Sequence, residues 1–335
     1  MSERPLALFA LDGRHLPLLF PPDVLSRLTG LADIDPTLVV RDFGDARVRE
    51  RLAEVEVLIT GWGCPAIHPE ALAALPRLRA VLHTGGTVKY LLPPEGWQRG
   101  LVVSSAADAN ALPVAEYTLG MILLVGKDVF ALRESYRARR GFTLGEVHGR
   151  VGNLGRRVGV IGASRIGRRV VELLRAFDFE VALHDPYLDP DDARRLGVRA
   201  VGLDELLAGS DIVTVHAPAT GETRHLLDAA RLARMPDGAV LINTARGSLV
   251  ETDALTAELV NGRLGAVLDV TEPEPLPTDS PLYDLPNVVL TPHIAGSHGN
   301  ELRRLGLTAV HELERLLTGV PLVHRVEPDE LERAA

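Results

Sequence analysis

The stretch Val158-Gly159-Val160-Ile161-Gly162-Ala163-Ser164-Arg165-Ile166-Gly167 decides the fold of this chain. It begins as an apolar strand, passes through a glycine-rich turn and continues as a helix with an apolar inner face. This is the context of a dinucleotide-binding fingerprint, in which a strand feeds a helix whose first backbone N–H groups receive a pyrophosphate. Gly162 and Gly167 match the first and third glycines of that fingerprint.

Three neighbouring residues bear on this interpretation. Ser164 stands where the second glycine is usual, so its hydroxyl either pushes a phosphate outward or donates to it. Arg165 lies at the helix N-terminus, where backbone and charge both suit a pyrophosphate. Asp185 ends the next strand-like run, at the place of the carboxylate that binds ribose hydroxyls. Because an acid there repels a 2'-phosphate, Asp185 favours NAD over NADP.

Strand-like and helical patterns alternate on both sides of the fingerprint. The strand-like runs are residues 6–11, 38–40, 57–60, 80–83 and 101–104 before it, and 158–161, 181–184, 212–215, 239–242, 266–269 and 288–291 from it onward. Such alternation is typical of parallel sheets with helices on their faces. With 335 residues, the chain is also long enough for two domains. We therefore predict an α/β protein with two Rossmann-like, doubly wound domains.

Two helices stand out in this pattern. Residues 302–317 are amphipathic and end before Gly319 and Pro321, so a helix is expected to close the chain. Residues 112–126 are almost wholly apolar but contain Glu116 and fall short of the roughly 20 residues that cross a bilayer. A buried helix is expected there.

Composition excludes several classes of protein. A formal charge of -9 argues against nucleic acid or an acidic membrane surface as a partner, because phosphate binding needs a clustered basic excess. A single cysteine, Cys64, excludes an intramolecular disulfide and fits a cytoplasmic protein. The apolar run 6–11 is too short for the core of a signal peptide. The histidines lack metal-ligand spacing, so no metal is expected.

Three successive strands of the second sheet end in residues that can do chemistry on a 2-oxo acid. Arg246 follows the strand at 239–242, Glu272 and Glu274 follow the strand at 266–269, and His293 follows the last strand. Carboxyl ends of parallel strands share one edge, where ligands of open α/β sheets bind. A guanidinium can clamp a carboxylate in two hydrogen bonds, and an imidazole can transfer the proton of a ketone or alcohol oxygen.

At these positions the chain resembles the D-isomer-specific 2-hydroxyacid dehydrogenase family. The resemblance spans roughly residues 80 to 318 and is carried by Asn243-Thr244-Ala245-Arg246-Gly247, Leu268-Asp269-Val270 with Glu274-Pro275, and Leu290-Thr291-Pro292-His293-Ile294-Ala295-Gly296. Segments 114–118, 215–218 and 235–239 add to it. Lys89-Tyr90, Pro93-Pro94 and Thr271 depart from the pattern in places that concern the substrate.

The resemblance implies a role for each residue. Arg246 would bind and polarise the substrate, His293 would be the general acid and base, and Glu274 would orient His293, with Glu272 as its rival. The backbone amides of Gly85 and Gly86 would hold the substrate carboxylate, and the cofactor would be NAD. The expected cofactor-binding residues are Gly162, Ser164, Arg165, Ile166, Gly167, Asp185, His216, Ala217, Pro218, Thr223, Thr244, Ala245, Arg246, Asp269, His293 and Gly296.

The family also implies an organisation. Residues 1–108 with 300–335 would form the substrate domain and residues 109–299 the NAD-binding domain, with the cofactor in a cleft between them. The apolar helix at 112–126 and the arm through Gly149 suggest a homodimer interface.

Other functions remain open at this point. The fold also occurs in corepressors that sense dinucleotides, and relatives that oxidise formate or phosphite keep the arginine and histidine. A phosphoglycerate dehydrogenase with a C-terminal regulatory domain is disfavoured, since little chain follows the last helix. The particular hydroxy acid and the physiological direction are not predicted.

Overall fold

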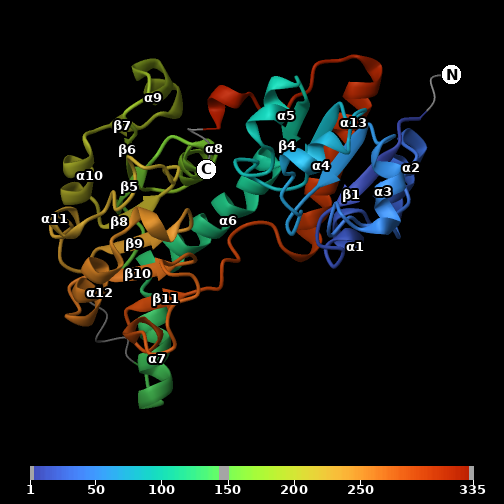
Figure 1. Ribbon diagram of the computed structural model, residues 1–335. Helices are drawn as coiled ribbons and strands as arrows, with labels where there is room; N and C mark the ends of the chain where they lie inside the picture. The colour runs from blue at the N-terminus through green and yellow to red at the C-terminus, as the bar shows by residue number, and fades with distance from the viewer. Residues whose placement is uncertain (1–3, 143–150, 332–335) are drawn as a thin grey trace. The chain divides into compact units, whose positions relative to one another are not determined.

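The structure, a computed structural model, describes residues 4–142 and 151–331. Its contacts divide the chain into two compact units: unit 1 comprises residues 1–110 and 297–334, and unit 2 comprises residues 111–296 (Figure 1). The last part of the expected interface arm, residues 143–150, lies outside the described residues.

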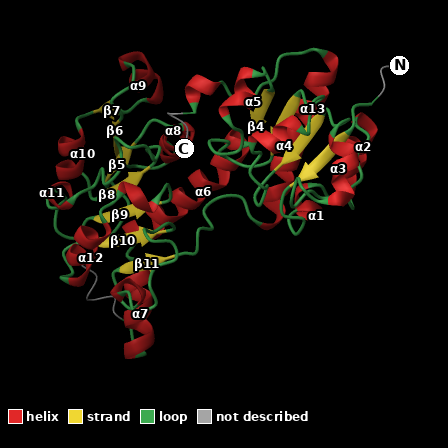
Figure 2. Ribbon diagram, in the orientation of Figure 1, coloured by secondary structure: helices red, strands yellow, loops and turns green. Residues whose placement is uncertain are grey.

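Unit 1 is built on a parallel sheet of four strands in the order β1-β2-β3-β4 (Figure 2). The strands are β1 (Ala7–Ala10), β2 (Val57–Thr60), β3 (Ala80–His83) and β4 (Val102–Ser105). One face is covered by α1 (Leu16–Leu19), α2 (Pro22–Leu31) and α13 (Leu302–Thr318). The other face is covered by α3 (Ala46–Leu52), α4 (Pro69–Ala73) and α5 (Pro94–Gln98). The closing helix predicted from the sequence is thus part of unit 1.

One glycine and one buried acid hold this closing segment in place. A Cβ on Gly306 of α13 would lie 1.9 Å from the carbonyl oxygen of Leu19, so only glycine lets α13 pack this closely against α1. The buried carboxylate of Glu312, within α13, accepts the backbone N–H groups of Val323 and His324, which follow the helix. This satisfies the charge of Glu312 and holds the C-terminal segment beside β4.

Unit 2 is built on a parallel sheet of seven strands in the order β11-β10-β9-β8-β5-β6-β7. The strands are β5 (Arg157–Ile161), β6 (Glu180–His184), β7 (Arg199–Ala200), β8 (Ile212–Val215), β9 (Val240–Asn243), β10 (Gly265–Leu268) and β11 (Val288–Leu290). Helices α10 (Leu203–Gly209), α11 (Ala229–Leu232) and α12 (Thr252–Val260) cover one face. Helices α6 (Ala107–Gly126), α8 (Arg165–Leu174) and α9 (Pro190–Leu196) cover the other. The doubly wound α/β fold is confirmed.

The order of the strands places a ligand crevice in unit 2. The chain leaves β5 toward β6 on one side and later returns to β8 on the other side of β5. Ligands of open α/β sheets bind at such a switch point, outside the carboxyl ends of the strands. The glycine turn after β5 lies at this point.

Helix α6 is longer than the sequence predicted. It has 20 residues, starts at Ala107 and continues through Pro113, and by length and composition alone it meets the test for a membrane-spanning helix. Core helices pass the same test. Within unit 2, Ala115 and Ile122 pack in one cluster with Val170 of α8. Helix α7 (Val129–Arg139) follows it.

Most of the predicted strands are confirmed to within a residue or two, and two differences are informative. The run at residues 38–40 is not a strand, since only Val39 forms an isolated bridge, to Phe9. Strand β7 was not predicted because its two residues are both exposed and carry no apolar pattern.

Candidate active site

The glycine turn between β5 and α8 requires glycine at two positions. Gly162 has a φ of 97°, in the left-handed region, and a Cβ there would lie 2.6 Å from the backbone nitrogen of Ala217. A Cβ on Gly167 would lie 2.0 Å from the carbonyl oxygen of Gly162. Strand, turn and helix therefore pack at backbone contact, which leaves the N-terminus of α8 open to an anion at the sheet edge.

Ser164 and Asp185 both bind the backbone of this turn. Ser164 is the N-cap of α8, and its hydroxyl accepts the N–H of Gly167 at 3.3 Å. One carboxylate oxygen of Asp185 accepts the N–H of Ala163 at 2.7 Å, and the other accepts the N–H of Tyr187 at 2.8 Å. The serine in place of the second glycine therefore caps the helix, and Asp185 stands beside the turn.

The segment after β8 passes behind the same turn. His216 donates its backbone N–H to Ile161, and its ring nitrogen Nε2 lies 2.9 Å from the hydroxyl of Thr214. Burial lowers the pKa of His216 to about 3, so its ring is neutral. Its Nδ1 is buried and has no hydrogen-bond partner among the described residues. Farther along, the hydroxyl of Thr223 donates to the carbonyl of Pro218 at 2.6 Å and closes this loop.

The turn after β9 presents Arg246. The side chain of Asn243 accepts the N–H of Ala245 at 3.0 Å and donates to the carbonyl of Arg246 at 2.9 Å, so one amide ties both sides of the turn. Arg246 is partly exposed, and its guanidinium donates to the carbonyl of Ala245 at 2.6 Å. Beyond it, a Cβ on Gly247 would overlap the backbone of Thr271, which brings this turn against the loop after β10.

His293 pairs with one of the two glutamates of the loop after β10. Its Nδ1 lies 2.6 Å from Oε1 of Glu274, and the two side chains are 50% and 43% exposed. Glu272 instead forms an ion pair with Arg224 at 2.9 Å, and its other carboxylate oxygen lies 3.4 Å from Nε2 of His225. The pair of Arg224 and Glu272 holds the pKa of that carboxyl below its ordinary value.

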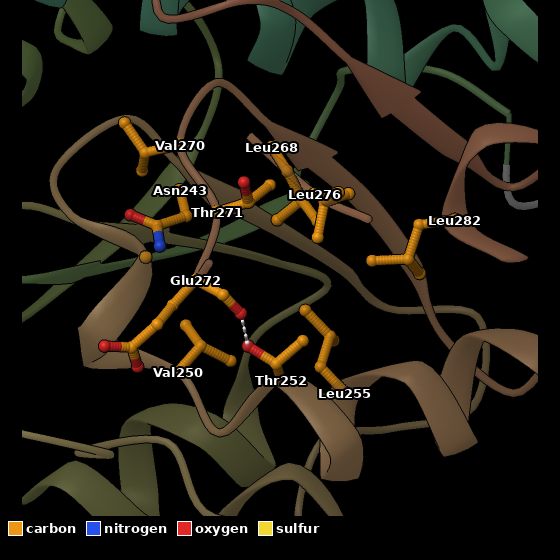
Figure 3. A pocket seen from close by; sticks show the side chains of 11 residues that line it. Asn243, Val250, Thr252, Leu255, Leu268, Val270, Thr271, Glu272, Leu276 and Leu282 are labelled. Atoms are coloured by element: carbon orange, nitrogen blue, oxygen red, sulfur yellow. Dashed lines mark hydrogen bonds between the residues drawn. The ribbon is translucent and has the colours of Figure 1, made fainter. Parts of the chain in front are cut away.

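The loop that carries both glutamates lies against α12 (Figure 3). The hydroxyl of Thr252 donates to the carbonyl of Glu272 at 2.6 Å, the bond drawn in that view. A cavity of about 20 Å³ lies beneath the loop and is lined by Asn243, Leu268, Val270 and Leu276, among others. A space of that size holds one water molecule, so it is too small for a substrate.

Backbone register brings the three turns to one edge of the unit 2 sheet. Asn243 at the end of β9 pairs with Leu268 at the end of β10, and Leu268 pairs with Leu290 at the end of β11. The turns that carry Arg246, Glu274 and His293 therefore start side by side at the same level of three adjacent strands.

Residues 119–295 match the model of the NAD-binding domain of the D-isomer-specific 2-hydroxyacid dehydrogenases, which is more than half of the chain. The chain belongs to this family. A glyoxylate reductase from Thermofilum pendens is 35% identical over 263 residues, 76% of this chain and 76% of that protein. The D-mandelate dehydrogenase of Rhodotorula graminis, a solved structure, superposes with a TM-score of 0.81 at 26% identity and covers 96% of this chain and 97% of its own.

Other relatives in the family are longer. The D-3-phosphoglycerate dehydrogenase of Mycobacterium tuberculosis H37Rv is 35% identical over 258 residues, which are 76% of this chain but 48% of that protein. The chain thus spans about half the length of the curated phosphoglycerate dehydrogenases that it matches.

The NAD-binding domain of the family falls within unit 2, and its cofactor is a nicotinamide dinucleotide. The residues of the turn after β5 fit such a group: a side chain at Gly162 or Gly167 would fill the space against the backbone, and α8 is long enough to present a helix N-terminus.

In unit 1, the loop after β3 carries Gly85 and Gly86, for which the family implies a substrate role. Buried His83 precedes them, and its Nδ1 lies 2.9 Å from the hydroxyl of Thr60 on β2. Burial lowers the pKa of His83 to about 4. A Cβ on Gly85 would lie 2.5 Å from Nε2 of His83, so this glycine lets the loop fold over the ring.

Sequence reasoning missed residues that hold the turns in place. Asn243 and Thr291 stand inside the motifs that were recognised, so their motifs were the available signal, but a side chain that binds backbone leaves no periodic pattern. Asp269, expected near the nicotinamide, is buried and accepts the N–H groups of Ile294 and Ala295 at 2.8 and 2.9 Å.

Proposed function

We propose that this chain is an NAD(H)-dependent oxidoreductase that interconverts a small 2-oxo acid and its D-2-hydroxy acid. The observation that carries the proposal is the 2.6 Å contact between His293 and Glu274, on an edge that Arg246 shares by strand register. An imidazole oriented by a carboxylate, next to a guanidinium, is a donor set for proton transfer at a carbonyl with an adjacent carboxylate.

Arg246 would bind the substrate. Its guanidinium presents two parallel N–H groups that match a carboxylate, and its turn is held rigid by the side-chain amide of Asn243. The present bond from the guanidinium to the carbonyl of Ala245 uses one of its five N–H groups. The others remain able to orient the substrate and to polarise its ketone.

His293 would transfer the proton. When bound, the nicotinamide supplies the hydride to C2 of the oxo acid or takes it back. In reduction, Nε2 of His293 donates its proton to the ketone oxygen, and in oxidation the same atom removes the proton of the hydroxyl. Glu274 on Nδ1 fixes the ring orientation. The charges of His293 and Arg246 would stabilise the negative oxygen in the transition state.

We expect NADH to be oxidised when a panel of 2-oxo acids, from glyoxylate and pyruvate to a bulky aromatic one, is added, followed as loss of absorbance at about 340 nm. Arg246→Gln should raise KM for the acid about 10- to 100-fold, since a charge-assisted bidentate contact is lost. Arg263→Gln is the matched control, because Arg263 binds Glu258 and two carbonyls elsewhere in unit 2.

Three outcomes are informative. Turnover that depends on Arg246 ranks the acids by size and supports the proposal. NADH binding without turnover of any 2-oxo acid would contradict it and favour a dinucleotide-sensing protein. Failure to reduce any 2-oxo acid, combined with reduction of NAD⁺ by formate or phosphite, followed as a gain of the NADH absorbance, would assign the activity to another small anion.

The cofactor is expected to be NAD rather than NADP. Asp185→Asn should lower the preference for NADH over NADPH about tenfold, because it removes the charge that repels a 2'-phosphate. The amide oxygen of the variant can still accept the N–H of Ala163, although its amide nitrogen cannot accept the N–H of Tyr187, so the bond to the glycine turn is kept. The ratio of kcat/KM for the two cofactors measures the effect. Asp189→Asn, which removes a charge from the N-cap of α9, should leave that ratio unchanged.

The remaining features of the proposal concern context. We infer that unit 1 is the substrate domain, that the amides of Gly85 and Gly86 hold the substrate carboxylate, and that the protein is a cytoplasmic homodimer. The charge of -9 argues against nucleic acid or a membrane surface as a partner. Burial raises the pKa of Cys64, the single cysteine, to about 12, so its thiol is kept unreactive.

A further inference from the structure

The turn that carries His293 has a backbone conformation that needs support. His293 has a φ of 55°, in the left-handed region that is uncommon for residues other than glycine, although histidine adopts it more often than most side chains do. Its backbone N–H donates to the carbonyl of Asp269 at 2.9 Å. The position of the imidazole therefore depends on what holds this turn.

The buried carboxylate of Asp269 binds three groups of the turn that carries His293. Oδ1 of Asp269 accepts the N–H of Ile294 at 2.8 Å, Oδ2 accepts the N–H of Ala295 at 2.9 Å, and the hydroxyl of Thr291 donates to Oδ1 at 2.6 Å. These donors lie on both sides of His293. If Asp269 shifts, the turn loses bonds before and after the histidine together.

The hydrogen bonds beyond Thr291 have a fixed direction. A hydroxyl has one proton, and Thr291 gives it to Asp269, whose oxygens act as acceptors. The hydroxyl of Tyr117, 2.7 Å from that of Thr291, must then be the donor of the next bond. Burial raises the pKa of Tyr117, which keeps its proton in place. The series of hydrogen bonds thus runs from Tyr117 through Thr291 to Asp269.

Two consecutive residues of helix α6, Tyr117 and Thr118, place their hydroxyls against two different turns. While Tyr117 binds Thr291, the hydroxyl of Thr118 is bonded to Val114 and lies 3.2 Å from that of Thr244, in the turn of Arg246. Both contacts belong to unit 2. Helix α6 therefore contacts both the turn that carries His293 and the turn that carries Arg246.

We propose that Tyr117 is a positioning residue for His293, acting through Thr291 and Asp269, and that its hydroxyl fixes the turn in the conformation that proton transfer needs. The inference rests on the proposed function for its catalytic consequence. Its structural part, the ordering of residues 291–296 by a hydroxyl on α6, stands independently of that function.

Tyr117→Phe removes this one hydroxyl and keeps the ring. In the cofactor-free protein, we expect backbone amide hydrogen exchange at Ile294 and Ala295 to accelerate about three- to tenfold, as for the loss of one hydrogen bond. With cofactor and a 2-oxo acid, kcat should fall about three- to tenfold while KM stays within about twofold, because Arg246 is not moved. Thr291→Val should reproduce both changes, and Thr291→Ser, which keeps the hydroxyl, should restore wild-type values.

Tyr283→Phe is the matched control. Its hydroxyl donates to the carbonyl of Leu276, also in unit 2, so it should change neither exchange at residues 294 and 295 nor kcat. Unchanged exchange at Ile294 and Ala295 in Tyr117→Phe would overturn the proposal, as would equal acceleration in Tyr283→Phe. If wild-type protein turns over no 2-oxo acid but exchange responds as expected, the positioning of the turn holds and only the proposed function fails.

Discussion

Replacing His293 by asparagine is expected to lower kcat for 2-oxo acid reduction about a thousandfold. General acid catalysis by a positioned side chain contributes roughly 10²- to 10⁴-fold, and asparagine cannot take on and release the proton. Asparagine is the right replacement because it tolerates the left-handed backbone at φ 55° better than alanine or glutamine. Half of the side chain is exposed, so stability should change little. Steady-state kinetics with NADH measures the fall in kcat, thermal unfolding measures the stability, and fluorescence titration with NADH checks that the variant still binds the cofactor.

The two glutamates of the neighbouring loop supply the control for this result. Glu274→Gln should lower kcat about 10- to 100-fold, since the carboxylate on Nδ1 is lost. Glu272→Gln makes the same chemical change two residues away, where the carboxylate pairs with Arg224, and should leave kcat within about twofold. A His293→Asn variant with more than about a third of wild-type kcat would rule out this histidine as the proton donor.

The sequence alone predicted that the turns carrying the candidate site residues lie at one edge of the second sheet. Arg246, the glutamate loop and His293 each follow an apolar run of a parallel sheet, and adjacent parallel strands end at one edge. That inference needs the order of elements and no side-chain detail. It also explains why strands β5 to β11 were found except β7, whose exposed residues bury no side chain.

Choices between chemically equivalent residues could not be made from the sequence. Glu272 and Glu274 both precede a proline, and only the path of the loop decides that Glu274 faces His293. The sequence left open whether the hydroxyl of Ser164 donates to a phosphate or pushes it outward. In the structure this hydroxyl caps helix α8, which is a frequent role of serine. Helix α6 was expected only over the apolar run at residues 112–126, but it starts at Ala107 and continues through Pro113.

Acidification from about pH 7 to about pH 5 should destabilise both units by about 2 kcal/mol each. His83 in unit 1 and His216 in unit 2 have an ordinary pKa of 6.5 when exposed, and burial lowers it to about 4 and about 3 in the folded protein. Below about pH 6.5 the unfolded chain binds a proton at each histidine that the folded chain does not, so stability is full above that pH and falls as the pH decreases toward the folded values. Each pH unit within that window is worth about 1.4 kcal/mol per histidine.

Urea unfolding at the two pH values can separate the units, because both tryptophans, Trp62 and Trp97, lie in unit 1 and circular dichroism reports on both. His83→Gln should remove most of the pH sensitivity of the fluorescence transition, with an amide still available to Thr60. His216→Gln should instead remove most of the pH sensitivity of the unfolding of unit 2. That unit has no tryptophan, so its unfolding is seen by circular dichroism and not by fluorescence. Each variant shares all the other histidines with wild type. The difference between their changes in unfolding free energy from pH 7 to pH 5 therefore reports on the replaced histidine alone. An equal loss of stability between pH 7 and pH 5 in wild type and both variants would contradict this prediction. It would show that the folded protein does not keep His83 and His216 uncharged at pH 5.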